Sequence, residues 1–202
     1  MIEAMAKSVE KLSRKSDSEG KFNPDLKIDK KDYKDQKDFL REEYDPDSKI
    51  YINRDDNGDV YKVNGVVEPN SEFTINGYTY TTDNLGRTVK VEGRLHLKKH
   101  EGRRQIENDV PGRLEGDDRG HIIADELDGS NGKENLVPMS KDLNRSGDYR
   151  NLEREWKKAL KDGKEIYVSI EPEYDGESKR PTSFYVSYTI DNESYEKIIL
   201  NK

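Results

Sequence analysis

Residues 116–156 read GDDRGHIIADELDGSNGKENLVPMSKDLNRSGDYRNLEREW. His121, one of three histidines in the chain, follows Asp117, Asp118 and Arg119 and comes directly before an apolar run that we expect to form a short strand. A histidine among charged side chains is awkward to pack but well suited to proton transfer near neutral pH. This stretch is therefore the first candidate for a catalytic centre.

The chain beyond His121 shows loop, strand and helix signals in turn. A glycine-rich loop occupies residues 125–134, and a short apolar strand is predicted at 135–139. Residues 140–147 turn the chain before a predicted helix. Two more strands are predicted at 165–174 and 182–191. Strands arranged around a single helix predict an α+β fold with an antiparallel sheet.

The helix predicted at 148–161 has signals at both ends. Asp148 or Ser146 is expected to cap its first turn, and Gly163 is expected to end it in the left-handed conformation that helix C-termini favour. Its apolar residues recur at helical spacing and form one stripe: Leu152, Trp156, Ala159 and Leu160. We expect this stripe to face the core.

Residues 49–104 predict a β-meander, a β-rich lead-in to the segment 105–202 that holds His121. Short runs with a period of two are separated by Asn-Gly and Asp-Asn-Gly turns, whose positive φ suits tight hairpins. Four tyrosines lie in these runs, and we expect them to pack on a half-buried face rather than stack on bases: Tyr51, Tyr61, Tyr78 and Tyr80.

Residues 1–48 predict a charged, poorly ordered N-terminal arm or linker. The chain is 30% hydrophobic and 39% charged with a net charge of −7, which is too little apolar material to bury every residue. It has no cysteine, which excludes disulfides and thiolate metal sites. No apolar run has membrane-spanning or signal-peptide character. Because the chain is acidic, any contact with nucleic acid must be local.

The polar residues around His121 offer what phosphodiester hydrolysis requires. A base must deprotonate water, and histidine titrates in the right range. Arg119 supplies a planar fork for a phosphate. A hard divalent ion held by few protein oxygens would neutralise developing charge, and Asn135, Asn144 and Glu153 carry candidate oxygens.

These motifs resemble the DNA/RNA non-specific endonuclease family, one of the His-Me finger (ββα-metal) nucleases. The likeness rests on DRGH at 118–121, NLVPM at 135–139, LN at 143–144 and LE at 152–153, in the order and spacing of the family. It covers residues 116–161 and extends over the strands predicted up to residue 191. The resemblance implies a ββα-metal core on an antiparallel sheet. It also implies cleavage of DNA, with RNA as an alternative substrate, to leave a 5′-phosphate.

The resemblance implies a role for each polar residue. His121, at the end of the first finger strand, would be the general base, and Arg119 would stabilise charge on the scissile phosphate. Asn144, at the start of the finger helix, would be the main protein ligand of one Mg²⁺, for which Mn²⁺ can substitute. Glu153, two turns further along, would hold the waters around that metal.

Three further residues would support the motif. Asn135 would assist the base or the phosphate, and Asp118 and Gly120 would fix the backbone around His121. The interval from Asn144 to Glu153 is one residue longer than in some relatives, which makes Glu153 the departure from the family pattern.

Each of these residues has a structural alternative. His121 could be a hydrogen-bonded packing residue, and Arg119 could merely neutralise its acidic neighbours. Asn144 and Asn135 could be turn residues, a common use of asparagine. Glu153 lies four positions before Lys157, a spacing that suits an ion pair along a helix. The motif favours the catalytic roles of His121, Arg119 and Asn144, and leaves those of Asn135 and Glu153 open.

Basic residues gather between Gly86 and Arg104 and form a candidate nucleic-acid interface. It comprises Arg94, Lys98, Arg103 and Arg104, to which Arg145 is added from the turn before the helix. The alternative is a solvated edge strand guarded by basic side chains. His96 and His100 lie in the same segment and are expected at the surface or near phosphate, not as metal ligands.

Residues 63–95 resemble the lead-in of bacterial polymorphic toxins, in particular nuclease toxins exported by the type VII secretion system of Gram-positive bacteria. The resemblance implies that the chain is the C-terminal part of a longer, non-classically secreted protein that acts in the cytoplasm of target bacteria. A cognate immunity protein would inhibit it in the producing cell. We expect a monomer with no membrane contact.

Two other functions stay open at this point. The fold could be an inactive module that only binds nucleic acid or a partner, although intact DRGH and Asn144 argue against decay. It could also be a secreted scavenging DNase that has no immunity partner.

Overall fold

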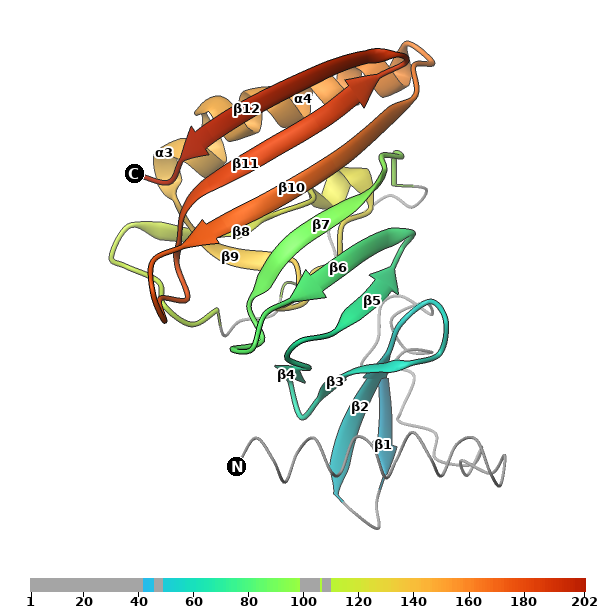
Figure 1. The fold of residues 1–202 in the computed structure, drawn as a ribbon, viewed down its shortest axis with the longest axis vertical. Coiled ribbons are helices and arrows are strands. Elements are labelled where there is room, and N and C mark those ends of the chain that lie inside the picture. Colours follow the sequence, from blue (N-terminus) through green and yellow to red (C-terminus); the bar gives the residue numbers. More distant parts are fainter. Residues whose placement is uncertain (1–41, 46–48, 99–105, 107–109) are drawn as a thin grey trace.

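The computed structural model describes residues 42–45, 49–98, 106 and 110–202 (Figure 1). These residues form three antiparallel sheets with helices α3 and α4 beside them. The predicted arm lies outside the described residues except at its end, where Glu42–Asp45 form strand β1. No helix in the described part of the chain is long and apolar enough to cross a membrane.

The predicted meander divides between two sheets. Its first part forms a sheet in the order β1-β2-β3-β4, with β2 at Ile50–Arg54, β3 at Val60–Val63 and β4 at Val66–Val67. Pro69 follows β4 and cannot donate a ladder hydrogen bond, so the pairing ends there. The next strands enter the second sheet.

The second sheet has the order β12-β11-β10-β7-β6-β5 and combines both halves of the described chain. Its strands are β5 Glu72–Ile75, β6 Tyr78–Thr82, β7 Thr88–Arg94, β10 Ile166–Tyr174, β11 Pro181–Ile190 and β12 Glu193–Leu200. Strand β7 pairs with β10, so that Val91 lies opposite Ile170. The sheet therefore spans the predicted division between 49–104 and 105–202.

Strand β12 was not predicted. Its first five residues carry charged or hydroxyl groups, and all of its residues except Ile199 are exposed at this edge of the sheet. Strands without an apolar face give no period-two signal. The pairing of β12 with β11 along its whole length extends the sheet by one strand.

Helix α4 covers one face of this sheet, as Figure 1 shows along β10–β12. It spans Asp148–Lys161 as predicted and buries Tyr149, Leu152 and Trp156. Trp156 contacts the ring of Tyr188 edge-on, and Tyr149 contacts Phe184 in the same way. The predicted stripe is confirmed for Leu152 and Trp156, while Ala159 and Leu160 are only partly buried.

The predictions for the two ends of α4 had different outcomes. Gly163 has a φ of +81°, the left-handed conformation predicted for it. The N-terminal prediction was wrong, since the capping residue is Gly147 and no side chain caps the helix. A separate short helix ends at Arg145, and only Ser146 lies between it and this glycine.

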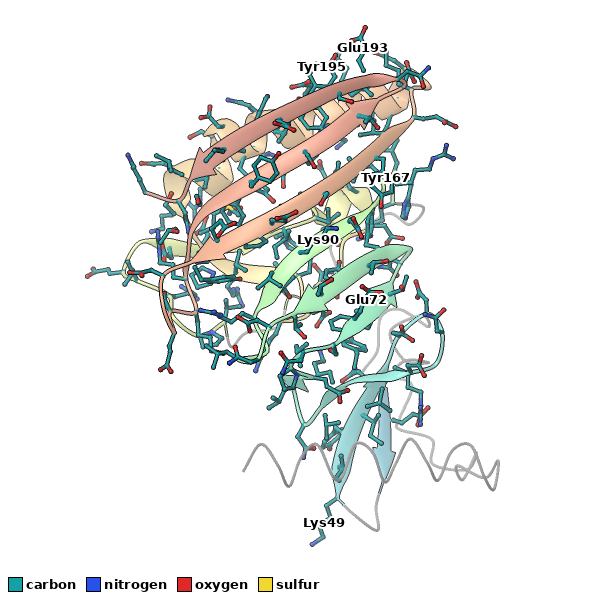
Figure 2. The ribbon with its side chains drawn as sticks, viewed as in Figure 1. Lys49, Glu72, Lys90, Tyr167, Glu193 and Tyr195 are labelled. Carbon is teal, nitrogen blue, oxygen red and sulfur yellow. The ribbon has the colours of Figure 1, made fainter. Side chains whose placement is uncertain are left out.

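The opposite face of the sheet is open to solvent, and Lys90 and Tyr167 stand on it (Figure 2). Among the tyrosines of the meander, Tyr61, Tyr78 and Tyr80 are buried as predicted. Tyr51 is 49% exposed, so the packing prediction was wrong for it. It lies in β2, in the small first sheet.

The third sheet is the hairpin of β8 (Asp117–His121) and β9 (Leu136–Ser140). A buried ion pair holds it against the large sheet: Arg180 donates to both carboxylate oxygens of Asp117, at 2.8 and 3.1 Å. Burial pushes the pKa of Asp117 up, but the hydrogen bonds from Arg180 and from the Leu114 backbone outweigh it and hold that pKa below its usual range. The pair thus fixes the start of the strand that ends at His121.

We predict that Arg180→Met lowers the free energy of unfolding by about 3–5 kcal/mol at pH 7, because it leaves a buried carboxylate unpaired. Since the fold holds the pKa of Asp117 low, the contribution of the pair is full above the unfolded-state pKa of about 3.9. It disappears as the pH falls through the lower folded-state value. Urea unfolding at pH 7 and in acid measures both effects.

The control for this substitution is Arg154→Met, which removes an exposed guanidinium from α4. It should change stability by no more than about 0.5 kcal/mol. Equal losses in the two variants would show that the Asp117 pair is not what Arg180 contributes.

Candidate active site

His121 is the last residue of β8 and lies opposite Leu136 of β9. Its predicted position at the end of a strand is confirmed, but the strand is the polar run before it, and the apolar Ile122 and Ile123 after it are not a strand. Both isoleucines are fully buried, and Tyr149 of α4 donates its hydroxyl to the carbonyl of Ile122 at 2.7 Å. The core thus holds the backbone directly after the histidine.

Gly120 allows the two strands of the hairpin to approach each other. A Cβ at this position would lie 2.5 Å from the Met139 Cβ, closer than any real contact. Met139 is fully buried, so it has little room to move. The supporting role predicted for Gly120 therefore has a steric basis.

The His121 ring is hydrogen-bonded to a residue that sequence reasoning did not identify. Its Nε2 lies 2.6 Å from Asn131 Oδ1, and Asn131 Nδ2 donates to Asp125 Oδ1 at 3.1 Å. Asp125 belongs to the 3₁₀ turn η2 (Asp125–Leu127), and Asn131 belongs to the glycine-rich loop. Loop residues of these types suit many purposes. The role of Asp125 and Asn131 beside His121 becomes visible only in the structure, where the loop folds back toward β8.

Asn144 lies in the short helix α3 (Lys141–Arg145), and not at the start of the long helix as predicted. The hydroxyl of Ser140 caps α3 by accepting from the Leu143 backbone at 3.3 Å. Residues 140–147, predicted to turn the chain, thus include a helical segment. It directs the side chain of Asn144 toward β8, where Nδ2 donates to Asp118 Oδ2 at 3.0 Å.

Asp118 connects β8 with α3. Besides Asn144, its carboxylate accepts two hydrogen bonds from Arg145, both at 2.8 Å. The Arg145 guanidinium holds the pKa of this carboxyl below its usual range. Asp118 was expected to fix the motif's backbone, but its carboxylate accepts from the side chains of Asn144 and Arg145. The carboxylate that accepts from the backbone is that of Asp117, bonded to the Leu114 N–H at 2.9 Å.

Glu153 projects from α4, and its side chain is 11% exposed. Burial raises its pKa to about 7, although the hydrogen bond from Arg150, at 2.9 Å, acts in the opposite direction. The alternative ion pair with Lys157 was wrong, since Lys157 pairs with Glu126 at 2.9 Å. Glu153 is thus a carboxyl poised between its two protonation states at neutral pH.

Asn135 is fully buried and holds the glycine-rich loop to the hairpin. Its Oδ1 accepts from the Ile123 N–H at 2.9 Å, and its Nδ2 donates to the carbonyls of Ile123 and Ser130 at 2.8 and 2.7 Å. These bonds engage both ends of the amide. Asn135 therefore fixes the backbone of the glycine-rich loop relative to the residues after His121.

Half of the predicted site residues line one open cleft beside the hairpin. Its lining side chains come from β8, η2, the glycine-rich loop, α3 and α4, and include His121, Arg119, Asn144, Glu153, Asp118 and Arg145. Arg113, Asp125, Glu126, Asn131 and Arg150 line it as well and were not predicted. The lining thus carries four arginines and four carboxylates.

The predicted nucleic-acid interface is only partly in this cleft. Arg94 lies outside its lining and pairs with Glu165 at 2.5 Å on the surface. Lys98 is nearly buried and pairs with Asp125, which places it behind the cleft wall. Arg103 and Arg104 lie outside the described residues, as does His100. His96 stacks on Tyr78, and its Nε2 lies 3.4 Å from Asp128 Oδ2. Its expected place at the surface or near phosphate, and not as a metal ligand, stays a prediction.

The donor set of the cleft suits a hard, strongly hydrated cation. Because Asn144 Nδ2 faces Asp118, its Oδ1 is the amide atom left to bind such an ion. In the described part of the chain, no group of three or more His, Cys, Asp or Glu residues could form a protein cage for a metal. An ion bound by few protein oxygens and several waters is what Mg²⁺ tolerates. The residues present therefore fit the predicted metal.

The first strand of the hairpin ends in a histidine, and the helices that follow carry an amide and a carboxyl into the same cleft. This arrangement defines a nuclease of the ββα class. Residues 69–192 match the family described as DNA/RNA non-specific endonuclease. The chain belongs to this family, which confirms the resemblance found in its motifs.

The chain is also similar to curated and solved proteins. The type VII secretion system protein EssD of Staphylococcus aureus, from strains USA300 and Newman, is 40% identical over 145 residues. The match covers 67% of this chain but only 24% of EssD, so the chain spans about a quarter of the length of these relatives.

The fold is shared with NucA from Streptococcus agalactiae. Its crystal structure with a magnesium ion bound has a TM-score of 0.53 at 17% identity and covers 65% of this chain and 82% of NucA. The NucA structure with no metal bound gives 0.52 at 18% identity, over 76% of this chain and 79% of NucA. The predicted α+β, ββα-metal fold is thus confirmed.

We predict that Asn135→Ala destabilises the fold, because it leaves the Ile123 N–H and two carbonyls without their partner. Each buried backbone group left unsatisfied costs about 1–3 kcal/mol. Urea unfolding should detect the loss, and Asn151→Ala, an exposed asparagine on α4, should show almost none. A stable Asn135→Ala variant that had lost only activity would instead place Asn135 in contact with substrate.

Proposed function

We propose that the chain is a metal-dependent endonuclease that hydrolyses phosphodiester bonds of DNA, with RNA as an alternative substrate, and that His121 is its general base. The observation that carries the proposal is the convergence of His121, Arg119, Asn144 and Glu153 on one cleft. A neutral imidazole at the cleft wall accepts a proton from water at the ring nitrogen that does not face Asn131. The attack of that water breaks the bond to the 3′ oxygen and leaves a 5′-phosphate.

The other residues of the cleft handle charge. Arg119 lies two positions before His121 on β8 and holds the phosphate with its planar fork. Asn144 Oδ1 would hold the divalent ion directly, and Glu153 would support the waters around it. When bound, Mg²⁺ or Mn²⁺ supplies positive charge to the phosphate and the leaving oxygen. The structure of NucA with a magnesium ion bound supports this choice of metal.

We predict that His121→Ala reduces cleavage of supercoiled plasmid by about 10²–10⁴-fold, the usual contribution of a general base. Its thermal unfolding should match that of the wild type, because the ring lies at the edge of the cleft. His96→Ala is the matched control and should retain cleavage, since His96 is outside the cleft lining. Full activity of His121→Ala would show that the base is elsewhere.

We predict that EDTA abolishes cleavage and that Mg²⁺ or Mn²⁺ restores it. Asn144→Ala should raise the Mg²⁺ concentration needed for half-maximal rate, because it removes the one proposed protein ligand. Asn151→Ala on the neighbouring helix should leave that concentration unchanged. Undiminished cleavage after chelation would contradict the metal scheme, and no cleavage under any condition would favour an inactive binding module.

We also propose that the nuclease is the toxic part of a longer protein secreted by a type VII system, acts in the cytoplasm of target bacteria and is held by an immunity protein in the producer. The similarity to EssD over about a quarter of its length supports this context. An adjacent reading frame whose small acidic product inhibits the nuclease would support the toxin. Its absence would favour a scavenging DNase.

A further inference from the structure

We propose that Lys62, on β3, is a positioning residue for the catalytic centre. Its ammonium pairs with the buried carboxylate of Glu134, and this carboxylate holds the part of the glycine-rich loop that contacts His121. The inference rests on the proposed role of His121 as the base. It extends the catalytic unit to the first sheet, because all four strands of this sheet come before residue 69, where the match to the nuclease family begins.

The first step is the burial of the ion pair. Lys62 Nζ lies 3.5 Å from Glu134 Oε2, and the two side chains are only 8% and 1% exposed. The ammonium also lies 5.7 Å from the centroid of the Tyr61 ring, which stacks on Phe73. Both charges are therefore nearly out of water, where a charge destabilises the fold unless another compensates it. Each member of the pair thus constrains the position of the other.

The second step is the fixed position of the lysine. Strand β3 lies between β2 and β4, and Lys62 is opposite Asn53 on one side and Val67 on the other. Two ladders therefore define where its side chain begins. Glu134 is attached separately to the large sheet, because its carbonyl accepts from the hydroxyl of Thr88 on β7 at 2.6 Å. The ion pair thus adds a connection from the first sheet to the loop.

The third step is the turn that the carboxylate organises. The hydroxyl of Ser130 donates to Glu134 Oε1, and the Gly132 N–H donates to Ser130 Oγ at 3.1 Å. Gly132 passes so close to the carboxylate that a Cβ at this position would overlap both of its oxygens. Residues 130–134 therefore wrap around one carboxylate, and a displaced carboxylate would leave the turn without its centre.

The last step is the reach of this turn to the imidazole. Asn131 lies between the two residues that contact the Glu134 carboxylate, and its Oδ1 lies 2.6 Å from His121 Nε2. The carboxylate therefore fixes Asn131 beside the ring, and Lys62 fixes the carboxylate. A catalytic group misplaced by about 1 Å costs about 100-fold in rate. The ion pair is thus expected to affect catalysis although it lies away from the cleft lining.

The test removes the ammonium and then the charge that it compensates. Lys62→Met keeps a side chain of similar length on β3 but leaves the Glu134 carboxylate without its ion pair. Adding Glu134→Gln to this variant removes the buried charge and keeps a side-chain oxygen for the hydroxyl of Ser130. Lys158→Met is the matched control, because it removes a lysine whose ion pair with Asp162 is exposed.

Amide hydrogen exchange of the full chain reports the state of the loop without any cleavage assay. The amides of Gly132 and Asn135 donate within the turn, to Ser130 Oγ and to the Gly132 carbonyl. In Lys62→Met we expect their exchange to become about tenfold faster or more, while the amides of α4 stay protected. The double variant should exchange more slowly than Lys62→Met, and Lys158→Met should match the wild type.

Plasmid cleavage in Mg²⁺ supplies the catalytic readout. At a temperature where every variant is folded, the kcat of Lys62→Met should fall by about 10- to 100-fold with KM unchanged, because the base is misplaced while substrate binding is kept. Adding Glu134→Gln should raise kcat again by about fivefold or more, since coupled residues give non-additive effects. Lys158→Met should cleave as fast as the wild type.

The outcomes separate this inference from the proposed function. Unchanged loop exchange in Lys62→Met, an unchanged kcat, or a double variant that recovers nothing overturns the positioning role even if His121→Ala is inactive. Exchange that rises equally in α4 also overturns it, since Lys62 then serves the whole fold. Faster loop exchange with the expected recovery, in a wild type that cleaves no substrate, supports the hold of Lys62 on the loop and removes only the nuclease proposal.

A milder variant keeps the test decisive if Lys62→Met does not fold. Lys62→Gln still donates a hydrogen bond toward the Glu134 carboxylate but carries no charge. It should show faster exchange of the Gly132 and Asn135 amides and a lower kcat, in the same directions as Lys62→Met. A folded Lys62→Gln variant with wild-type exchange and kcat would show that the charge of Lys62 does not position the loop.

Discussion

The carboxylate of Asp118 joins the two elements that the cleft needs. It lies on β8 three positions before His121 and accepts hydrogen bonds from Asn144 and Arg145, both on α3. One side chain therefore sets how far the imidazole on the strand stands from the amide on the helix. The same contact turns the amide so that nitrogen faces the carboxylate and oxygen faces away. Strand and helix could each be well formed without it, but their polar groups would not share a fixed geometry.

Charge in the cleft is balanced in pairs. Arg145 is held by Asp118, and Arg150 is held by Glu153 with Glu126 nearby. A phosphate that enters must compete with these carboxylates, which weakens its attraction to any single guanidinium. This balance agrees with the net charge of −7 and with basic residues that are engaged in ion pairs, such as Arg94 and Lys98.

Much of the fold could be predicted from local patterns. Helix α4 and Gly163 followed from periodicity and turn chemistry, and the position of His121 followed from its motif. Errors arose where local signals compete. Ser140 caps a short helix that the turn-like residues 140–147 conceal, so Asn144 was assigned to the wrong helix. Asp125 and Asn131 could not be found, because their significance lies in hydrogen bonds between loop and strand. The prediction for Lys98 failed for the same reason, because a lysine in a basic run is expected to be solvated and the sequence does not reveal its ion pair with Asp125.

The pairing of β7 with β10 has a consequence for how the molecule is made. Val91 meets Ile170 across that ladder, and the intervening residues include the whole hairpin and both helices. Contacts between such distant parts of a chain are expensive to close and form late. A ribosome must therefore deliver every residue from β7 through β10 before the central ladder can close. Until then the imidazole has no rigid surroundings, and the growing chain passes through synthesis without a finished cleft.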